Sequence, residues 1–415
     1  MLEICPLRNP IQHYDWGSVT AIPEFLGRPP SERPVAEVWL GAHPKAPSEV
    51  WIENGWDDLR QVLHRDPAGW LGADGPPSVD ISGPEDGSDA STARLPFLLK
   101  ILAAGKPLSI QAHPNLEQAR LGFEREEKAG IPRWDAKRNY RDRNHKPEII
   151  YAVTPFTVLC GFRPAAEILD LFDRFGLDAT RMDATGTDAV ELRQPLASGD
   201  ASLHAFFKAF LQADADKIAA WVERVTSRAA RMDGAEAEWV CRMAGEFPAD
   251  RGVLSPLFLN LRTLEPGEVV YTGPGVLHAY LHGLGIELMA NSDNVLRGAC
   301  TSKHVDADEL LRILEPSPQR PCFIKPTVQP GLERFATPSG ELCLSIIRVT
   351  EHAPFVQSAP KRPQILLCAE GNGHITSAAG RRVPFARDTS FVVPACADQY
   401  RIEGRGVLFL AEAGA

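Results

Sequence analysis

The chain has 415 residues, of which 44% are hydrophobic and 24% charged, and its formal net charge at pH 7 is −10. This length exceeds what one hydrophobic core usually serves, so two or three domains are expected. The acidic balance argues against nucleic acid and against an anionic membrane surface as partners, because both need a basic face.

No targeting or membrane segment is expected. The N-terminus has no basic stretch followed by a long apolar run, and no apolar run approaches the length of a bilayer span. The eight cysteines are scattered without a Cys-x-x-Cys pair, as is usual for buried thiols in a reducing compartment. We therefore expect a cytoplasmic protein.

The first part of the chain is expected to form strands and turns. Short apolar stretches alternate with proline and glycine over residues 1–55. Residues 51–71 are predicted to form a helix, because their leucines fall on one side. His43 precedes Pro44 and is interpreted as a surface or packing histidine, since no second ligand stands at a useful spacing.

A buried strand followed by a polar face begins the candidate site. Residues 97–102 are an apolar run of the kind that forms a buried strand. In the extended segment that follows, the two-residue period places Ser109, Gln111 and His113 on one face. Pro114 then ends the strand, because it lacks a backbone donor.

Two later stretches can complete this site. Lys146 and Glu148 share a face where the chain enters a predicted strand at residues 149–153. A strand, Pro-Gly turn and second strand then bring His278 and Tyr280 to a common face. Zinc accepts nitrogen and oxygen ligands of this kind. The residues that would suit it are Gln111, His113, Glu148 and His278.

A basic loop over residues 130–144 precedes the strand of Glu148. One interpretation is a loop that is fully solvated. The other is that a part of the loop faces the substrate, because the loop leads directly into the strand of Lys146 and Glu148. Its basic residues are Arg133, Lys137, Arg138, Arg141 and Arg143.

The later part of the chain changes its periodicity twice. Residues 164–247 have helical spacing, which predicts a helical insert that supplies no metal ligand. From residue 322 onward, short strands between glycine-rich and proline-rich turns suit a jelly roll. Its only histidines, His352 and His374, do not form a His-x-His element, so this second barrel is expected to hold no metal.

Several short blocks occur in a fixed order along the chain. They are YDWG (14–17), EVWLGAHP (37–44), QAHPN (111–115), GIP (130–132) with RNY (138–140), NHKPE (144–148), GVLHAY (275–280) and NSDNVLR (291–297). Together they resemble the type I mannose-6-phosphate isomerase family. The chain departs from the family pattern after the last block, where RGACT stands in place of RAGLT.

The resemblance implies a mainly β fold with a helical insert, made of two cupin-like jelly-roll β-barrels and an α-helical domain. Residues 1–160 together with 255–320 would form the catalytic jelly roll, and residues 161–254 the helical insert domain. Residues 321–415 would form a C-terminal cupin-like jelly roll without metal.

The resemblance also implies a zinc-dependent isomerase that interconverts D-mannose 6-phosphate and D-fructose 6-phosphate through an enediolate. One zinc ion per chain would be held by the four ligands named above. The partner is a small sugar phosphate, and a monomer is expected. Arg297 would be the catalytic arginine, with a permanent charge that can clamp an enediolate or a phosphate. The remaining site residues are Lys146, Glu287 and Asp293 as catalytic groups and Ser109, Lys100 and Tyr280 as substrate-binding groups.

Two other classes of protein remain open. A cupin oxygenase would hold Fe(II) with two histidines and a carboxylate, and Gln111 argues against it because that triad has no amide ligand. A cupin that binds sugar without catalysis need not keep Arg297 together with Lys146 and Glu148. Turnover of mannose 6-phosphate separates all three classes.

Overall fold

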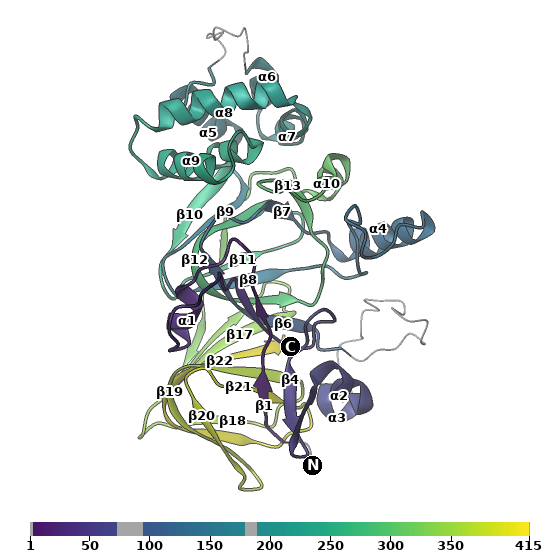
Figure 1. Cartoon of the computed structure of the whole chain (residues 1–415), viewed down its shortest axis with the longest axis vertical. Coiled ribbons are helices and arrows are strands. Elements are labelled where there is room, and N and C mark those ends of the chain that lie inside the picture. The colour runs from purple at the N-terminus through teal and green to yellow at the C-terminus, as the bar shows by residue number, and fades with distance from the viewer. Residues whose placement is uncertain (1–2, 73–93, 179–188, 415) are drawn as a thin grey trace.

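A computed structural model describes residues 3–72, 94–178 and 189–414 (Figure 1). A group of helices lies at one end of the long axis, one large sheet lies in the middle, and a second large sheet lies at the other end. Each sheet has eleven strands, and the pairings among the described strands form open paths. The expected mainly β chain with helices is confirmed, and the two cupin-like barrels stay a prediction.

The middle sheet, called the central sheet below, is organised around β12 (His278–Ala290). This strand pairs with β6 (Phe97–Ala104), β7 (Ile110–Ala112), β8 (Glu148–Ala152) and β9 (Phe156–Phe162). The other strands of the central sheet are β2 (Ile11–Gln12), β3 (Glu37–Leu40), β10 (Leu259–Leu264), β11 (Val269–Thr272), β13 (Leu296–Ala299) and β14 (Cys322–Phe323).

The register of the central sheet decides which polar residues meet. Every residue of β6 is buried, as its apolar sequence predicts, including the single charged residue Lys100. Antiparallel pairing places Lys100 opposite Glu287, and it places Gln111 opposite His278. Because cross-strand partners point to the same face, each pair brings its side chains together.

The second sheet, called the terminal sheet, combines the C-terminal strands with three strands from the N-terminus. Cys5 pairs with Val392, and Leu7 pairs with Val50, so the chain's beginning is part of this sheet. The boundaries given above for the three domains stay a prediction. The strands of the terminal sheet are β1 (Cys5–Arg8), β4 (Glu49–Ile52), β5 (Gly55–Asp58), β15 (Thr327–Gln329), β16 (Leu332–Ala336), β17 (Leu342–Val349), β18 (Phe355–Gln357), β19 (Gln364–Ser377), β20 (Arg382–Ala386), β21 (Ser390–Val393) and β22 (Tyr400–Ala413).

The helix predicted for residues 51–71 is wrong in its first half, where β4 and β5 form a hairpin. Glu53 and Asn54 both have positive φ, at 47° and 70°, which suits the tight turn that joins twisted strands. The helix begins only after Asp58, whose side chain caps α2 (Leu59–Arg65). The helix α3 (Pro67–Leu71) follows it directly.

The helical group occupies the sequence where helical spacing is predicted. Its aromatic residues are buried together, and Phe210 and Phe258 meet edge to face with ring centroids 4.9 Å apart. The same apolar core includes Ile110 and Leu296 of the central sheet, so the helices pack directly on the strands that carry the site. The helices of this group are α5 (Ala165–Arg174), α6 (Val190–Leu196), α7 (Leu203–Gln212), α8 (Ala215–Ala229) and α9 (Ala235–Glu246), with the 3-10 helices η1 (Asp200–Ser202) and η2 (Arg251–Leu257).

Three further helices lie along the sheets: α1 (Ala21–Phe25), α4 (Leu116–Lys128) and α10 (Ala307–Ile313). A capping box starts α4, because the side chains of Asn115 and Gln118 each accept a hydrogen bond from the other's backbone N–H. Among the described residues, no helix is long and apolar enough to cross a bilayer.

Candidate metal centre

Three side chains from distant parts of the sequence converge at one end of the central sheet. His113 follows β7, Glu148 begins β8, and His278 begins β12. All three are buried, and one ligand atom of each lies within 4.8 Å of the others. The candidate metal site therefore rests on residues that the strand pairing itself brings together.

Each of the two imidazoles uses one ring nitrogen in a hydrogen bond to a backbone carbonyl, and its other nitrogen faces the site. His113 Nδ1 lies 2.8 Å from the carbonyl oxygen of Asn294, and His278 Nδ1 lies 2.9 Å from that of Val276. A carbonyl only accepts, so each Nδ1 carries the proton. The Nε2 lone pairs then face Glu148, at 3.3 and 3.4 Å from its oxygens.

Three polar atoms at this point are buried without a hydrogen-bond partner in the described part of the chain. They are Nε2 of His113, Nε2 of His278 and Oε2 of Glu148. Folded proteins seldom leave buried polar atoms unsatisfied, and three at one point indicate a missing ligand. Imidazole nitrogen and carboxylate oxygen are the ligands that zinc takes in proteins, so these residues fit a zinc ion.

The protonation of these side chains also suits a metal. Burial lowers the pKa of His113 to about 4, with a further contribution from Lys146, so the ring is neutral. Burial raises the pKa of Glu148, but the Lys146 ammonium, 2.7 Å from Oε1, lowers it more, and it ends well below its usual value. Neutral imidazole and ionised carboxylate are the forms that bind metal.

Gln111, the fourth expected ligand, lies on the same face. It is half-buried in β7 and is the cross-strand partner of both His278 in β12 and Arg297 in β13. Since paired residues share a face, the amide is directed toward the side of the sheet that holds His278. Its role as a ligand stays a prediction.

Lys100 and Glu287 are both buried and form an ion pair of 3.0 Å. A second carboxylate, Glu37, lies 3.2 Å from the Lys100 ammonium and accepts a hydrogen bond from the Trp39 indole. Burial raises the pKa of Glu287 despite the attraction of Lys100. Glu37 was not singled out from the sequence, although it lies in the EVWLGAHP block.

Tyr280 and Ser109 flank the candidate ligands. The Tyr280 hydroxyl is buried without a hydrogen-bond partner in the described regions. Burial, with Glu148 and Glu287 nearby, raises its pKa well above the usual value, so the phenol keeps its proton and has a hydrogen bond to donate. Ser109 is half-buried immediately before β7.

Asp293 pairs with two cationic or ionisable side chains rather than with Arg297. Its carboxylate lies 2.9 Å from the Lys45 ammonium and 3.6 Å from His43 Nε2. Burial raises the pKa of Asp293, but His43 and Lys45 lower it more, and it ends far below its usual value. His43 itself is buried against Trp39 and lies outside the group of three ligands, as a packing histidine would.

Three cationic side chains, Arg297, Arg141 and Lys303, lie close enough to one another to interact. Burial and the neighbouring Arg141 lower the pKa of Arg297, and burial with Arg297 and Arg141 lowers that of Lys303. Like charges that lie close together in this way favour an anion beside them. Arg141 also lines a small cleft with Asp293. Arg141 belongs to the basic loop seen in the sequence, whereas Lys303 lies just past the last recognised block and was missed.

Comparison with known proteins gives a consistent result. Residues 4–165 match the family model "Phosphomannose isomerase type I, catalytic domain". The chain is 34% identical to mannose-6-phosphate isomerase of Escherichia coli K12 over 88% of both chains, and 30% identical to the human enzyme over 76% of this chain and 74% of that one. A crystal structure of a phosphomannose isomerase mutant from Salmonella typhimurium superimposes with a TM-score of 0.87 at 29% identity, and one of mannose 6-phosphate isomerase bound with zinc and yttrium with 0.86 at 29%. Both cover the full length of each chain.

Proposed function

The chain belongs to the type I mannose-6-phosphate isomerases, and from that premise we propose how its own residues carry out the reaction. The enzyme is a zinc-dependent isomerase that interconverts D-mannose 6-phosphate and D-fructose 6-phosphate. The observation that carries this proposal is the set of three buried, unpartnered ligand atoms on His113, Glu148 and His278.

In this proposal Gln111 completes a four-ligand site for one zinc ion. Two neutral imidazoles, a neutral amide and one carboxylate leave the site with a formal charge near +1. When bound, zinc supplies a fixed positive charge that polarises the sugar oxygens and favours an oxyanion beside it. Isomerisation needs such a charge, because moving a proton between adjacent carbons develops negative charge on the sugar.

Arg297 is the cation that the strand pairing places opposite the expected ligand Gln111. It stands opposite Gln111, so its guanidinium lies on the side of the sheet that faces the site. We assign to Arg297 the negative charge that develops on the sugar, and to Arg141 and Lys303 the phosphate. The support is the closeness of these cations: burial and Arg141 lower the pKa of Arg297, burial with Arg297 and Arg141 lowers that of Lys303, and a bound dianion would offset the repulsion.

The two carboxylates considered for proton transfer have different surroundings, which shift their pKa values in opposite directions. Glu287 has a raised pKa, which brings it closer to the range in which a carboxyl both gains and loses a proton. Asp293 is held ionised by Lys45 and His43, so it is the weaker candidate. We therefore assign proton transfer to Glu287, with Lys100 as its buried counter-ion.

The remaining pocket residues bind the sugar in this proposal. Tyr280 has an unused hydroxyl proton to donate to a sugar oxygen, and Ser109 stands beside the ligand strand. Lys146 pairs with Glu148 at 2.7 Å, and it can turn to a substrate oxygen once a metal takes that carboxylate.

A turnover assay tests the function directly. Protein stripped with a chelator should not convert mannose 6-phosphate, and added Zn²⁺ should restore conversion. Activity supported by Fe(II) and oxygen on another substrate would favour the oxygenase, and sugar binding without turnover would favour a binding protein. A cytoplasmic location and a monomeric state stay predictions, and light scattering of the purified protein checks the second.

A further inference from the structure

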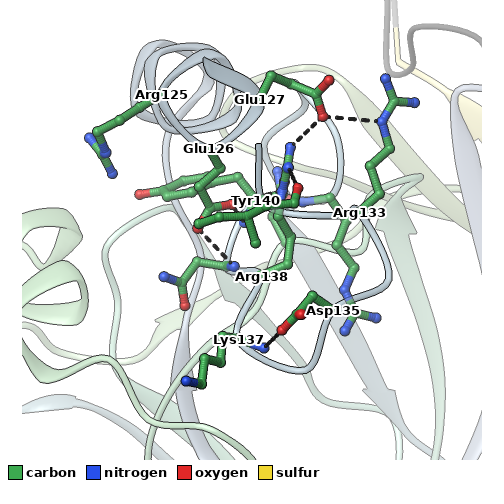
Figure 2. A network of polar contacts seen from close by, with 12 residues as sticks. Arg125, Glu126, Glu127, Arg133, Asp135, Lys137, Arg138 and Tyr140 are labelled. Atoms are coloured by element: carbon green, nitrogen blue, oxygen red, sulfur yellow. Dashed lines mark hydrogen bonds and ion pairs between the residues drawn. The ribbon is translucent and has the colours of Figure 1, made fainter. Parts of the chain in front are cut away.

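The loop that precedes the ligand Glu148 is fixed to helix α4 by a buried arginine (Figure 2). The Arg138 side chain is fully buried, with Nε 2.9 Å from Glu126 and Nη2 2.8 Å from Glu127. Glu126 in turn accepts the backbone N–H of Tyr140 at 2.8 Å. The loop backbone is therefore anchored on α4, which begins three residues after the proposed ligand His113.

The next residues of the loop close around one asparagine. Asn294 is fully buried, and its Oδ1 accepts the backbone N–H groups of Arg141 at 2.7 Å and Asp142 at 3.2 Å. Its Nδ2 donates to the carbonyl oxygens of Asp142 and Asn144, both at 2.8 Å. One amide thus satisfies four backbone groups of the loop, which uses both of its donors and its acceptor oxygen.

The same asparagine is joined to the candidate metal centre through its backbone. Its carbonyl oxygen accepts the Nδ1 proton of His113, the bond that turns the other nitrogen of that ring toward the metal site. The loop is also tied to the neighbouring residue, because the Asp142 carboxylate accepts the Asp293 N–H at 2.7 Å. Arg297 lies in β13, three residues after Asn294.

We propose that Asn294 is a positioning residue that couples the metal ligand His113 to the cation Arg141. Its side chain holds the Arg141 loop against the segment whose carbonyl orients His113. Loss of the amide would remove the hydrogen-bond partner that it gives to the N–H groups of Arg141 and Asp142 and to the Asp142 carbonyl, and it would leave the Asn144 carbonyl with the Ser292 hydroxyl at 3.2 Å. Relaxation of the loop would then move both the acceptor of the ligand His113 and the cation assigned to the phosphate. This inference rests on the proposed zinc isomerase function.

The test compares Asn294→Ala with a matched loss of a buried amide elsewhere. Gln364 in the terminal sheet is buried, donates to Glu412 at 2.8 Å and accepts the Tyr400 hydroxyl at 2.9 Å, so Gln364→Ala removes two hydrogen bonds of a buried amide in the other sheet. Zinc affinity is measured by competition with a chromophoric chelator, independently of turnover. Asn294→Ala should weaken zinc binding roughly 10- to 100-fold, the usual cost of losing a group that orients a ligand.

A second measurement separates positioning from general loss of stability. At saturating zinc, Asn294→Ala should raise KM for mannose 6-phosphate, because Arg141 is displaced, while Gln364→Ala should lower only the melting temperature. If Asn294→Ala does not fold, Asn294→Ser, which retains one hydroxyl, takes its place. Zinc affinity and KM equal to those of Gln364→Ala would overturn the positioning role. A wild-type protein that neither binds zinc nor turns over substrate would overturn the proposed function instead.

Discussion

The central and terminal sheets have the same number of strands but differ in whether they bury charged side chains. The central sheet buries Lys100, Glu287 and Glu148 together with the two ligand histidines. In the described part of the terminal sheet, the buried polar side chains are uncharged, as with Ser345, Gln364 and Ser390, and its core is apolar. Burying an ionised side chain costs free energy even when it is paired, so the central sheet is less stable than its packing alone would make it.

This difference shows which sheet performs chemistry. A fold keeps buried charges and unsatisfied ligand atoms only where another requirement outweighs stability. In the central sheet that requirement is the proposed site for zinc and a sugar anion. The terminal sheet includes β1, β4 and β5 from the start of the chain and stabilises the molecule. Its described residues contain no cluster of side chains that could hold a metal ion.

The largest expected effect comes from removing a ligand of the central sheet. His113→Ala or His278→Ala should abolish both zinc binding and turnover, since each removes one of the two imidazole nitrogens that hold the ion and leaves the remaining buried groups without it. His374→Ala, in β19 of the terminal sheet, is the matched control and should change neither. Metal analysis of the purified proteins with an isomerase assay checks all three. Turnover in either ligand variant would contradict the assignment of the metal site to the central sheet.

The next effect concerns the cation beside the ligands. Arg297→Ala should lower kcat at least ~10²-fold, with zinc content and melting temperature near wild type, because a charge-stabilising group acts mainly in the transition state. Arg297→Lys should rescue poorly, since an ammonium lacks the planar pair of donors.

Two results distinguish the roles open to Arg297. A loss mainly in KM would assign it to the phosphate, and early melting with loss of zinc would make it structural. Arg334→Ala, which removes a partly exposed arginine paired with Glu412 in the terminal sheet, is the control and should leave kcat unchanged.

A third prediction concerns the buried ion group itself. Lys100→Met leaves Glu37 and Glu287 without their cation, and it should lower the free energy of unfolding by ~3–5 kcal/mol, as breaking a buried pair usually does. Adding Glu37→Gln and Glu287→Gln should restore most of the stability but no turnover. Urea unfolding of the metal-free single and triple variants measures their stability, and an isomerase assay measures turnover. A triple variant with normal kcat would show that these charges are not needed for the reaction.

The smallest effect is expected in the apolar core of the terminal sheet. Ile375→Val removes one buried methylene from β19 and should cost ~0.5–1.5 kcal/mol of unfolding free energy. Zinc affinity and kcat should equal those of the wild type. A change in either would mean that the terminal sheet is coupled to the metal centre, and it would contradict the division of roles described above.

The sequence by itself determined the local structure and the family. Alternation over residues 109–113 placed Gln111 and His113 on one face, and helical spacing over residues 164–247 matches the helices found there. Both follow from side-chain periodicity, which neighbouring residues encode. The same signal failed at residues 51–58, where apolar spacing suggested a helix but a two-residue turn made a hairpin.

Only the tertiary structure decided which side chains meet. Lys100 pairs with Glu37, which lies 63 residues earlier in the chain, and with Glu287, its cross-strand partner, and its binding of substrate stays a prediction. Asn294 reaches the loop 150 residues before it and the ligand His113 181 residues before it. Periodicity carries no information about such partners, because they depend on the register between strands, and that register is set by burying the whole apolar face at once.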